Sequence, residues 1–451
     1  MKALSLIFLI FPLTLFAQTK LAVSENGRFL QYDNGKPFFW LGDTAWELFH
    51  RLDKEESEQY LKNRAYKGFT VIQAVVLAEL DGLNTPNREG EIPLIGNDPL
   101  KPNEAYFKHV DFVIDKAKKL GLFIGLLPTW GDKFNKRWGV GPEIFTPENA
   151  LAYGKFLANR YKNKPIIWIL GGDRIPEDEV HYQIIDEMAK GIRSVVGQSQ
   201  IITYHPSGES SSSKYFHDRD WLDMNLFQSG HGHAYNPNYQ KTLNDYKLKP
   251  IKPVIDGEPC YEDHPINWRS ANGWFDAFES RRAAYWSVLS GACGNTYGNH
   301  NIWQMWQEGL NPISQARSNW WQALDFPGAF QAGYMRKFFE SRPWQLLVPE
   351  ENLISEYPND NGKDCRAALA SDKSFAMVYI PYGNNVTVDL SMIAGDAKKL
   401  WWYSPVIGKA IFIDTIQSNA KLMMDPPDDE KRGNDWVLVI DQADKDFPKP
   451  E

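Results

Sequence analysis

Long apolar runs, separated by polar and glycine-rich turns, recur along the first two thirds of the chain. Together with shorter strand-like runs they give eight strand candidates, which begin at Phe38, Phe69, Leu122, Ile166, Gln200, Leu222, Pro253 and Ala292. FTVIQAVVL (69–77) is an almost continuous apolar run, which is typical of a strand covered on both faces. Segments with helical patterns separate most of the runs. One of these, 103–121, opens on Asn103 and closes on Gly121.

This alternation predicts the fold. Strands that alternate with helices pair in parallel, and eight such units in roughly 300 residues predict a (β/α)8 TIM barrel, of class α/β. A doubly wound open sheet is the main alternative. It would place a glycine-rich phosphate loop after the first strand, where this chain has LGDTAWE instead.

The pattern changes near Trp344. Short alternating segments such as SFAMVYIPYG and NVTVDLSMI follow, divided by Gly, Pro and Asn turns. Such segments predict a small β-sandwich. We therefore expect a catalytic barrel over 18–343 and a C-terminal β-sandwich domain over 344–451.

The N-terminus has the pattern of a secretory leader. Residues 1–17, MKALSLIFLIFPLTLFA, combine one Lys, an apolar stretch and a small residue at Ala17. Pro12 and the shortness of the run argue against a membrane span. No Cys stands directly after the apolar stretch of the leader, so a lipid anchor is not indicated. We expect an exported protein, periplasmic or extracellular, and the spacing of its three Cys predicts no disulfide.

Composition narrows the class of partner. The 451-residue chain carries 49 basic and 57 acidic residues with no basic block, which argues against nucleic acid. It also contains 17 Trp, and 14% of its residues are aromatic. Aromatic faces hold sugar rings by packing on their C–H groups, although filling a large core accounts for these residues equally well.

Polar and aromatic residues stand where the predicted strands end. In a (β/α)8 barrel the chemistry lies at the C-terminal ends of the strands. Two carboxylates are prominent there: IIWILGGD breaks on two glycines before Asp173, and PVIDGEP presents Glu258. Turn capping is the alternative role for Asp173. The residues expected to line a substrate pocket with this pair are Asp43, Trp46, Gln73, Trp130, His205, Gln228, Tyr297 and Trp303.

Two carboxylates across a pocket suit glycoside hydrolysis. One protonates the leaving oxygen, and the other attacks the anomeric carbon or activates water. Acids on strands four and seven resemble the pair of the large retaining glycosidase clan. That clan usually carries Glu after Asn on strand four, whereas this chain has Asp173 after two Gly. The shorter side chain affects the carboxylate separation, on which retention or inversion depends.

Longer motifs indicate one family within this clan. FFWLGDTAWELFHRL, WGDKF, WILGGD, VIDGEPCYED and YGNHNIWQMW resemble the apiosidase-like family of Bacteroidetes-type glycoside hydrolases over nearly the whole mature chain. The resemblance implies a barrel with a small C-terminal β-domain and an oligosaccharide or polysaccharide substrate. It also implies release of D-apiose from galacturonic acid of the pectin rhamnogalacturonan II, with no cofactor. Asp173 matches the family's acid/base, and Glu258 matches its nucleophile.

Other functions remain open at this stage. The barrel could act on a different plant or host glycan. His205, His231 and His233 could suggest a metal hydrolase, but metal-dependent barrels usually place His-x-His on strand one, and no H-E-x-x-H motif occurs. We expect no metal, and we expect these His to bond substrate or pack loops. A non-catalytic glycan-binding protein would keep the Trp residues and lose one carboxylate, whereas both are present.

Overall fold

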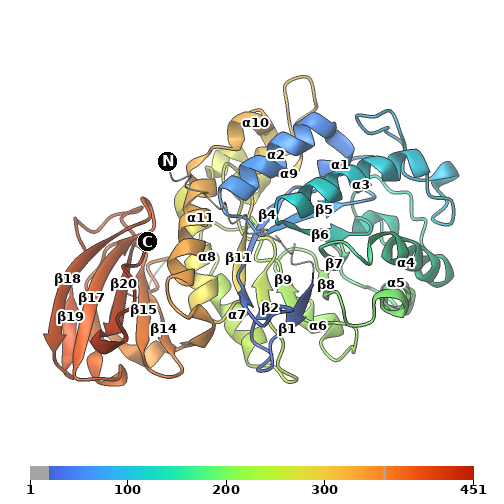
Figure 1. Cartoon of the computed structure of the whole chain (residues 1–451). Helices are drawn as coiled ribbons and strands as arrows, with labels where there is room; N and C mark the ends of the chain where they lie inside the picture. The colour runs from blue at the N-terminus through green and yellow to red at the C-terminus, as the bar shows by residue number, and fades with distance from the viewer. Residues whose placement is uncertain (1–19, 359–361) are drawn as a thin grey trace, which may run out of the picture.

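The computed structural model describes residues 20–358 and 362–451, which form a barrel and a C-terminal β-domain (Figure 1). The predicted leader, residues 1–17, lies outside the described residues. Within the described ranges, no helix is both long and apolar enough to cross a bilayer. All three cysteines are buried and unpaired.

Parallel strands form the barrel. They are β4 (Trp40–Thr44), β5 (Val71–Val75), β6 (Phe123–Leu127), β7 (Ile166–Gly171), β8 (Ile202–His205), β9 (Asn225–Phe227), β10 (Val254–Asp256) and β11 (Gly294–Tyr297). They pair in the order β11-β4-β5-β6-β7-β8, and β9 pairs with β10. The N–H of Asp223 donates to the carbonyl of Ile202, and that of Cys293 donates to Val254, both at 2.9 Å. These bonds connect the two sheets and close the barrel, which confirms the predicted fold.

Helices surround these strands. They are α1 (Leu48–Arg51), α2 (Lys54–Tyr66), α3 (Glu104–Lys119), α4 (Pro147–Tyr161), α5 (Glu179–Val196), α6 (Ser213–Phe216), α7 (Asn238–Tyr246), α8 (Ala277–Leu289), α9 (His300–Trp303), α10 (Trp320–Ala323) and α11 (Pro327–Glu340). Side chains cap several N-termini. Asn103 accepts the N–H of Ala105 at the start of α3, as its position in the sequence predicts.

Alternation along each strand separates two apolar clusters. Successive side chains point to opposite faces of a strand, so Trp40 lies inside the barrel while Leu41 faces the helices. The short antiparallel sheet of β1 (Leu21–Val23), β2 (Leu30–Tyr32) and β3 (Pro37–Phe38) adds apolar side chains to the interior cluster. It lies at the N-terminal end of the barrel, which leaves the opposite end for the site (Figure 1).

The C-terminal domain is built from two antiparallel sheets. One contains β12 (Leu347–Pro349), β14 (Arg366–Ala370), β15 (Phe375–Ile380), β20 (Trp436–Gln442), β17 (Ala397–Ser404) and β18 (Lys409–Gln417). The other contains β13 (Ile354–Glu356), β16 (Val386–Asp389) and β19 (Lys421–Met424). A separate apolar cluster fills the space between them, as in a β-sandwich.

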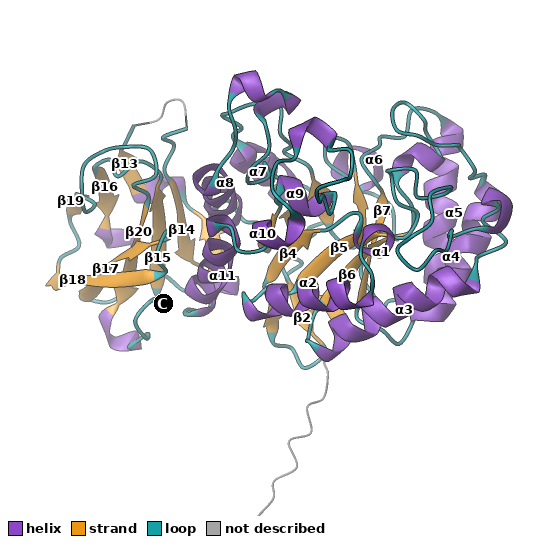
Figure 2. Ribbon diagram, turned by 90° about the horizontal axis from the view of Figure 1, so that it is seen from above, coloured by secondary structure: helices purple, strands orange, loops and turns teal. Residues whose placement is uncertain are grey.

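Helices α8 and α11 of the barrel lie between its strands and the C-terminal domain (Figure 2). Tyr285 stacks on Tyr379 with ring centroids 4.9 Å apart. The guanidinium of Arg281 bonds the carboxylate of Asp435, with Nε 2.8 Å from Oδ2. Both of these residues are buried. The domains therefore share a packed interface.

Candidate active site

A pocket of about 750 Å³ opens at the C-terminal end of the barrel. This volume is within the range of sites that enclose organic ligands. Two groups of side chains dominate the lining. The aromatic ones are Trp46, Trp130, Trp138, Tyr261, Trp268 and Trp303. The acidic ones are Glu79, Asp173, Glu209 and Glu258.

Two glycines aim Asp173 into this pocket. Gly171 and Gly172 have φ of +93° and +94°, and Asp173 itself has φ of +58°. A Cβ on Gly171 would lie 2.5 Å from the carbonyl oxygen of His205. At the positions of Gly171 and Gly172 only glycine fits without strain, because φ lies beyond +90° and other atoms stand within 3 Å of an added Cβ. The apolar strand therefore stops on two glycines because the chain must turn there to present the carboxylate.

The environment of Asp173 favours its protonated form. Burial and the negative charge of Glu258 raise the pKa of Asp173 to about 7. His205, Arg174 and the Trp138 indole oppose this shift, the last by donating from Nε1 to Oδ2 at 3.2 Å. The side chain remains 21% exposed. Asp173 can therefore carry a proton near neutral pH and reach a ligand in the pocket.

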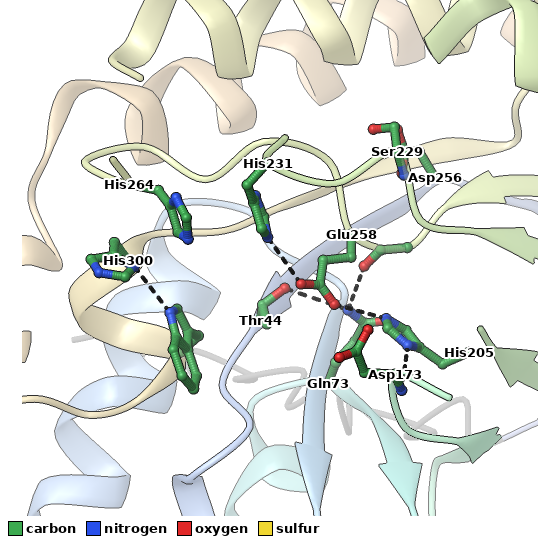
Figure 3. Close-up of polar contacts among 12 residues, drawn as sticks. Thr44, Gln73, Asp173, His205, Ser229, His231, Asp256, Glu258, His264 and His300 are labelled. Carbon is green, nitrogen blue, oxygen red and sulfur yellow. Dashed lines mark hydrogen bonds and ion pairs between the residues drawn. The ribbon is translucent and has the colours of Figure 1, made fainter. Parts of the chain in front are cut away.

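The pKa of Glu258 is shifted in the opposite direction, downward. Burial disfavours its ionised form, but two histidines outweigh this effect and lower the pKa of Glu258 to about 2. Nε2 of His231 lies 3.0 Å from Oε1, and Nε2 of His205 lies 3.0 Å from Oε2 (Figure 3). Glu258 is therefore ionised where Asp173 is protonated, which is the division of roles that carboxylate pairs need in catalysis.

The structure brings six of the ten predicted site residues together. Asp173 and Glu258 line the pocket with Trp46, Trp130, Gln228 and Trp303. Nε1 of Trp130 and Oε1 of Gln228 are buried without a hydrogen-bond partner. Such atoms are suited to bonding a ligand, because leaving them unpaired costs free energy.

Gln73 and His205 are predicted pocket residues that the structure places behind the lining. Nε2 of Gln73 donates to the carbonyl of Gly257 at 2.9 Å. His205 contacts Glu258 and accepts the backbone N–H of Asp173 at Nδ1. Both side chains support the segments that carry the two carboxylates.

For Asp43 and Tyr297 the predicted place in the pocket is wrong. Asp43 is fully buried and accepts hydrogen bonds from the Tyr60 hydroxyl and from Nε of Arg64. The Tyr297 hydroxyl donates to Glu262. Both residues occupy helix-facing positions of their strands, because their neighbours along the strand point into the barrel.

Several residues of the pocket come from loops and were not predicted. Trp138 and Trp268 are 41% and 48% exposed, and they follow the residue pairs KR and IN in the sequence. Trp residues in the loops that follow barrel strands were the sequence signal available for them. Glu79 follows β5, and its pKa is raised well above the usual range by burial and by neighbouring carboxylates, Glu47 and Asp173 among them.

The histidines near Glu258 form a ring cluster, in which His231 stacks on His264 and His300 meets His264 edge to face. His231 and His264 lie with centroids 4.3 Å apart, and His264 and His300 lie 4.4 Å apart. His233 is exposed at the rim, with Nε2 3.4 Å from Glu209. Among the side chains of residues 20–358 and 362–451, no group of three or more His, Cys, Asp or Glu is arranged to hold a metal ion.

Fold and site together define a glycoside hydrolase. Residues 24–345 match the model for apiosidase-like catalytic domains, so the chain belongs to the apiosidase-like family. Residues 348–441 match a putative collagen-binding domain of a collagenase. No curated protein matches the sequence.

Solved structures agree with this assignment. The chain is similar to a glycoside hydrolase family 5 protein from Bacteroides vulgatus, with 32% identity, 96% and 95% of the two chains covered, and a TM-score of 0.88. A second glycoside hydrolase has 32% identity, 96% and 99% coverage, and a TM-score of 0.87. A putative glycoside hydrolase from Bacteroides vulgatus, at 15% identity, 94% and 82% coverage and a TM-score of 0.65, shares the fold.

Proposed function

We propose that this glycoside hydrolase releases D-apiose from galacturonic acid in rhamnogalacturonan II, with retention of configuration. Asp173 is the acid/base, and Glu258 is the nucleophile. The observation that carries the proposal is the opposite displacement of the two carboxyl pKa values, to about 7 and about 2, in one pocket.

The reaction follows from these protonation states. Glu258 attacks the anomeric carbon, and the bond between that carbon and the leaving oxygen breaks. Asp173 donates a proton to the leaving oxygen at the same time. The glycosyl ester removes the negative charge of Glu258, so the pKa of Asp173 falls. Asp173 then accepts a proton from the water that attacks the ester, which frees the sugar and restores both carboxyls.

Charge in the pocket supports a neutral sugar as the unit that is released. Four carboxyl groups line it, and no Lys or Arg is found among the described lining residues. A uronate bound beside Glu258 would meet like charge, whereas apiose is uncharged. The half-exposed guanidinium of Arg137, next to Trp138 in the sequence, lies outside this lining and pairs with Glu177. The carboxylate of galacturonic acid could share this guanidinium with Glu177.

The same proposal includes location and domain organisation. Residues 1–17 act as a signal peptide that directs the protein to the periplasm or beyond. The catalytic domain then spans 18–343, and the β-sandwich domain spans 344–451. Export would place the enzyme where polymeric pectin fragments are found.

Incubation with a panel of pectin side-chain oligosaccharides tests the substrate. We expect mass spectrometry to detect free apiose and a galacturonate-containing fragment lacking it. Release of a different sugar would favour the alternative of a barrel glycosidase on another glycan. Binding without any product would favour a glycan-binding protein.

Asp173→Ala tests the assignment of roles. This variant should lose turnover of natural oligosaccharides and keep the first step on an activated aryl glycoside, whose leaving group needs little protonation. Azide should restore turnover of the aryl substrate and give a glycosyl azide of retained configuration. Equal loss on both substrates without rescue would contradict the assignment.

A further inference from the structure

Trp138 lies directly beside the proposed acid. It belongs to the segment between β6 and α4, and its indole Nε1 donates to Oδ2 of Asp173 at 3.2 Å. The ring lines the pocket and is 41% exposed. One polar atom of this side chain is therefore committed to the carboxyl, while much of its ring faces solvent.

The Arg174 guanidinium covers Trp138 on one side. The guanidinium carbon lies 3.9 Å from the ring centroid, in cation–π contact. The Arg174 side chain is fully buried, so this layer of the stack is fixed. Any ligand that stacks on Trp138 must use the ring face turned away from Arg174.

The same guanidinium fixes the loop relative to the acid. Nε of Arg174 donates to the carbonyl of Asn135 at 2.9 Å, and Nη1 donates to the carbonyl of Asp173 at 2.8 Å. Nη2 donates to the carbonyl of Trp138. Two of these bonds tie the strand end that carries Asp173 to the loop that carries the indole, and the third fixes the guanidinium on the backbone of Asp173 itself. The position of the ring relative to the carboxyl is preorganised.

We propose that Trp138 forms the leaving-group subsite, in which its open face stacks on the departing sugar ring while its N–H positions the Asp173 carboxyl. The proposal rests on the proposed role of Asp173. An acid that protonates the glycosidic oxygen lies next to the junction of the two sugars. An exposed aromatic ring bonded to that acid is therefore in reach of the sugar that leaves, and sugar C–H groups pack on such faces.

The hydrogen bond also selects which oxygen of Asp173 carries the proton. Because Nε1–H occupies Oδ2, the proton is left for Oδ1. The bond favours the ionised carboxylate, which is the form needed when Asp173 acts as base. The other charged or titratable groups that influence Asp173 are Glu258 after β10, His205 on β8, the adjacent Arg174 and Glu79 after β5.

Two variants separate the two contributions of Trp138. Trp138→Phe keeps an aromatic face and loses the N–H, whereas Trp138→Ala loses both. Trp321 provides the matched control, because it is also 41% exposed and lies outside the pocket lining. Trp321→Phe and Trp321→Ala should leave KM and the pH profile unchanged. Thermal melting of all four variants reports whether each is folded.

The first readout is the titration of Asp173, followed by carbon-13 NMR of labelled aspartate, which needs no substrate. Asp173 should titrate at higher pH in Trp138→Phe than in the wild type, because a bond to the ionised form is lost while the aromatic wall that buries the carboxyl is kept. The basic limb of kcat/KM on the intact oligosaccharide that the wild type cleaves should move the same way, because the leaving group of that substrate needs the proton of Asp173. A folded Trp138→Phe with an unchanged Asp173 titration would overturn the positioning role.

The second readout is affinity for the intact oligosaccharide that the wild type cleaves, measured by calorimetry in the Glu258→Gln background. Trp138→Ala should weaken binding about fivefold or more, and Trp138→Phe should stay within about twofold, as expected for loss or retention of one stacking contact. Unchanged affinity in Trp138→Ala would overturn the subsite. Failed azide rescue in Asp173→Ala, with these Trp138 effects intact, would instead count against the proposed function alone.

Discussion

The imidazole of His205 accepts the backbone N–H of Asp173 at Nδ1, over 3.2 Å. A neutral imidazole that accepts at Nδ1 carries its proton on Nε2. That Nε2 lies 3.0 Å from Oε2 of Glu258, although the contact is not aligned as a hydrogen bond. One buried ring therefore holds the turn that presents the acid and directs a proton toward the nucleophile.

Activity should depend on pH as the two carboxyls require. Asp173 must be protonated, and burial with the charge of Glu258 raises its pKa to about 7, so kcat/KM should fall as pH rises above about 7. Glu258 must be ionised, and its pKa of about 2 places the acidic limb far below neutrality. Initial rates across pH on the oligosaccharide that the enzyme cleaves measure both limbs, because the leaving group of that substrate needs the proton of Asp173. The two apparent pKa values describe the coupled pair of carboxyls. A basic limb near pH 4 would contradict this environment.

Replacing His205 should damage the nucleophile. His205→Phe removes the contact with Glu258 and leaves the N–H of Asp173 without its acceptor, so the acidic limb should move to higher pH. Leaving the buried N–H of Asp173 without its acceptor costs about 1–3 kcal/mol, and a loss of that size in the transition state lowers kcat by about 5- to 150-fold. The exposed His233, replaced by Phe, serves as the control. Equal pH profiles for wild type and His205→Phe would show that this contact does not tune Glu258.

Removing the charge of Glu258 should abolish turnover and lower the pKa of Asp173. Glu258→Gln should abolish turnover of every substrate, since no nucleophile remains, while the protein stays folded. It should also lower the pKa of Asp173 below about 7, because the nearby negative charge raises it in the wild type. NMR titration of the variant measures this shift. An unchanged Asp173 titration would mean that burial alone sets its pKa.

The turn after β7 should not tolerate a side chain. Gly171→Ala places a Cβ 2.5 Å from the His205 carbonyl at φ of +93°, and we expect it to cost about 2–5 kcal/mol of unfolding free energy. Gly68→Ala is the matched control, since φ is +87° there with nothing within 4 Å. It should cost only about 1 kcal/mol and leave activity intact. Chemical denaturation and kcat measure both. Similar losses in the two variants would show that the clash with His205 is relieved.

Asp43 should matter for stability rather than for substrate binding. Arg64→Met leaves its carboxylate buried without its ion pair, which should cost about 3–5 kcal/mol. Lys62→Met on the same helix removes an exposed partner of Glu58 and should cost under about 1 kcal/mol. Melting temperatures measure the difference. A raised KM in a folded Arg64→Met would return Asp43 to the substrate site.

Strands β5, β6 and β7 were predictable because their apolar runs are long and nearly continuous. Strand ends alone were not sufficient to assign the pocket, because a residue at the end of a strand can face either side. Thr44 and Gln73 face the interior, where their side chains meet at 3.5 Å, while Asp43 faces the helices. One position along the strand decides whether a polar group meets substrate or a buried arginine.

The pocket residues that lie on loops could not be predicted from the sequence for a different reason. Trp268 reaches the pocket through two consecutive left-handed residues, with φ of 52° at Asn267 and 62° at Trp268. The N–H of Asn267 is held by the carbonyl of His231, which belongs to another loop. Such placement depends on tertiary contacts between segments distant in the chain, and no local periodicity encodes it.

The interface between helices α8 and α11 of the barrel and the β-sandwich also limits how this protein can be shortened. Helix α11 ends at Glu340 and β12 begins at Leu347, so little chain is available to act as a tether. A truncated barrel would expose Tyr285 and leave Arg281 without Asp435. The β-sandwich is therefore not an interchangeable appendage on a flexible arm. Transplanting the barrel into another architecture would require redesigning the surface that the sandwich now covers.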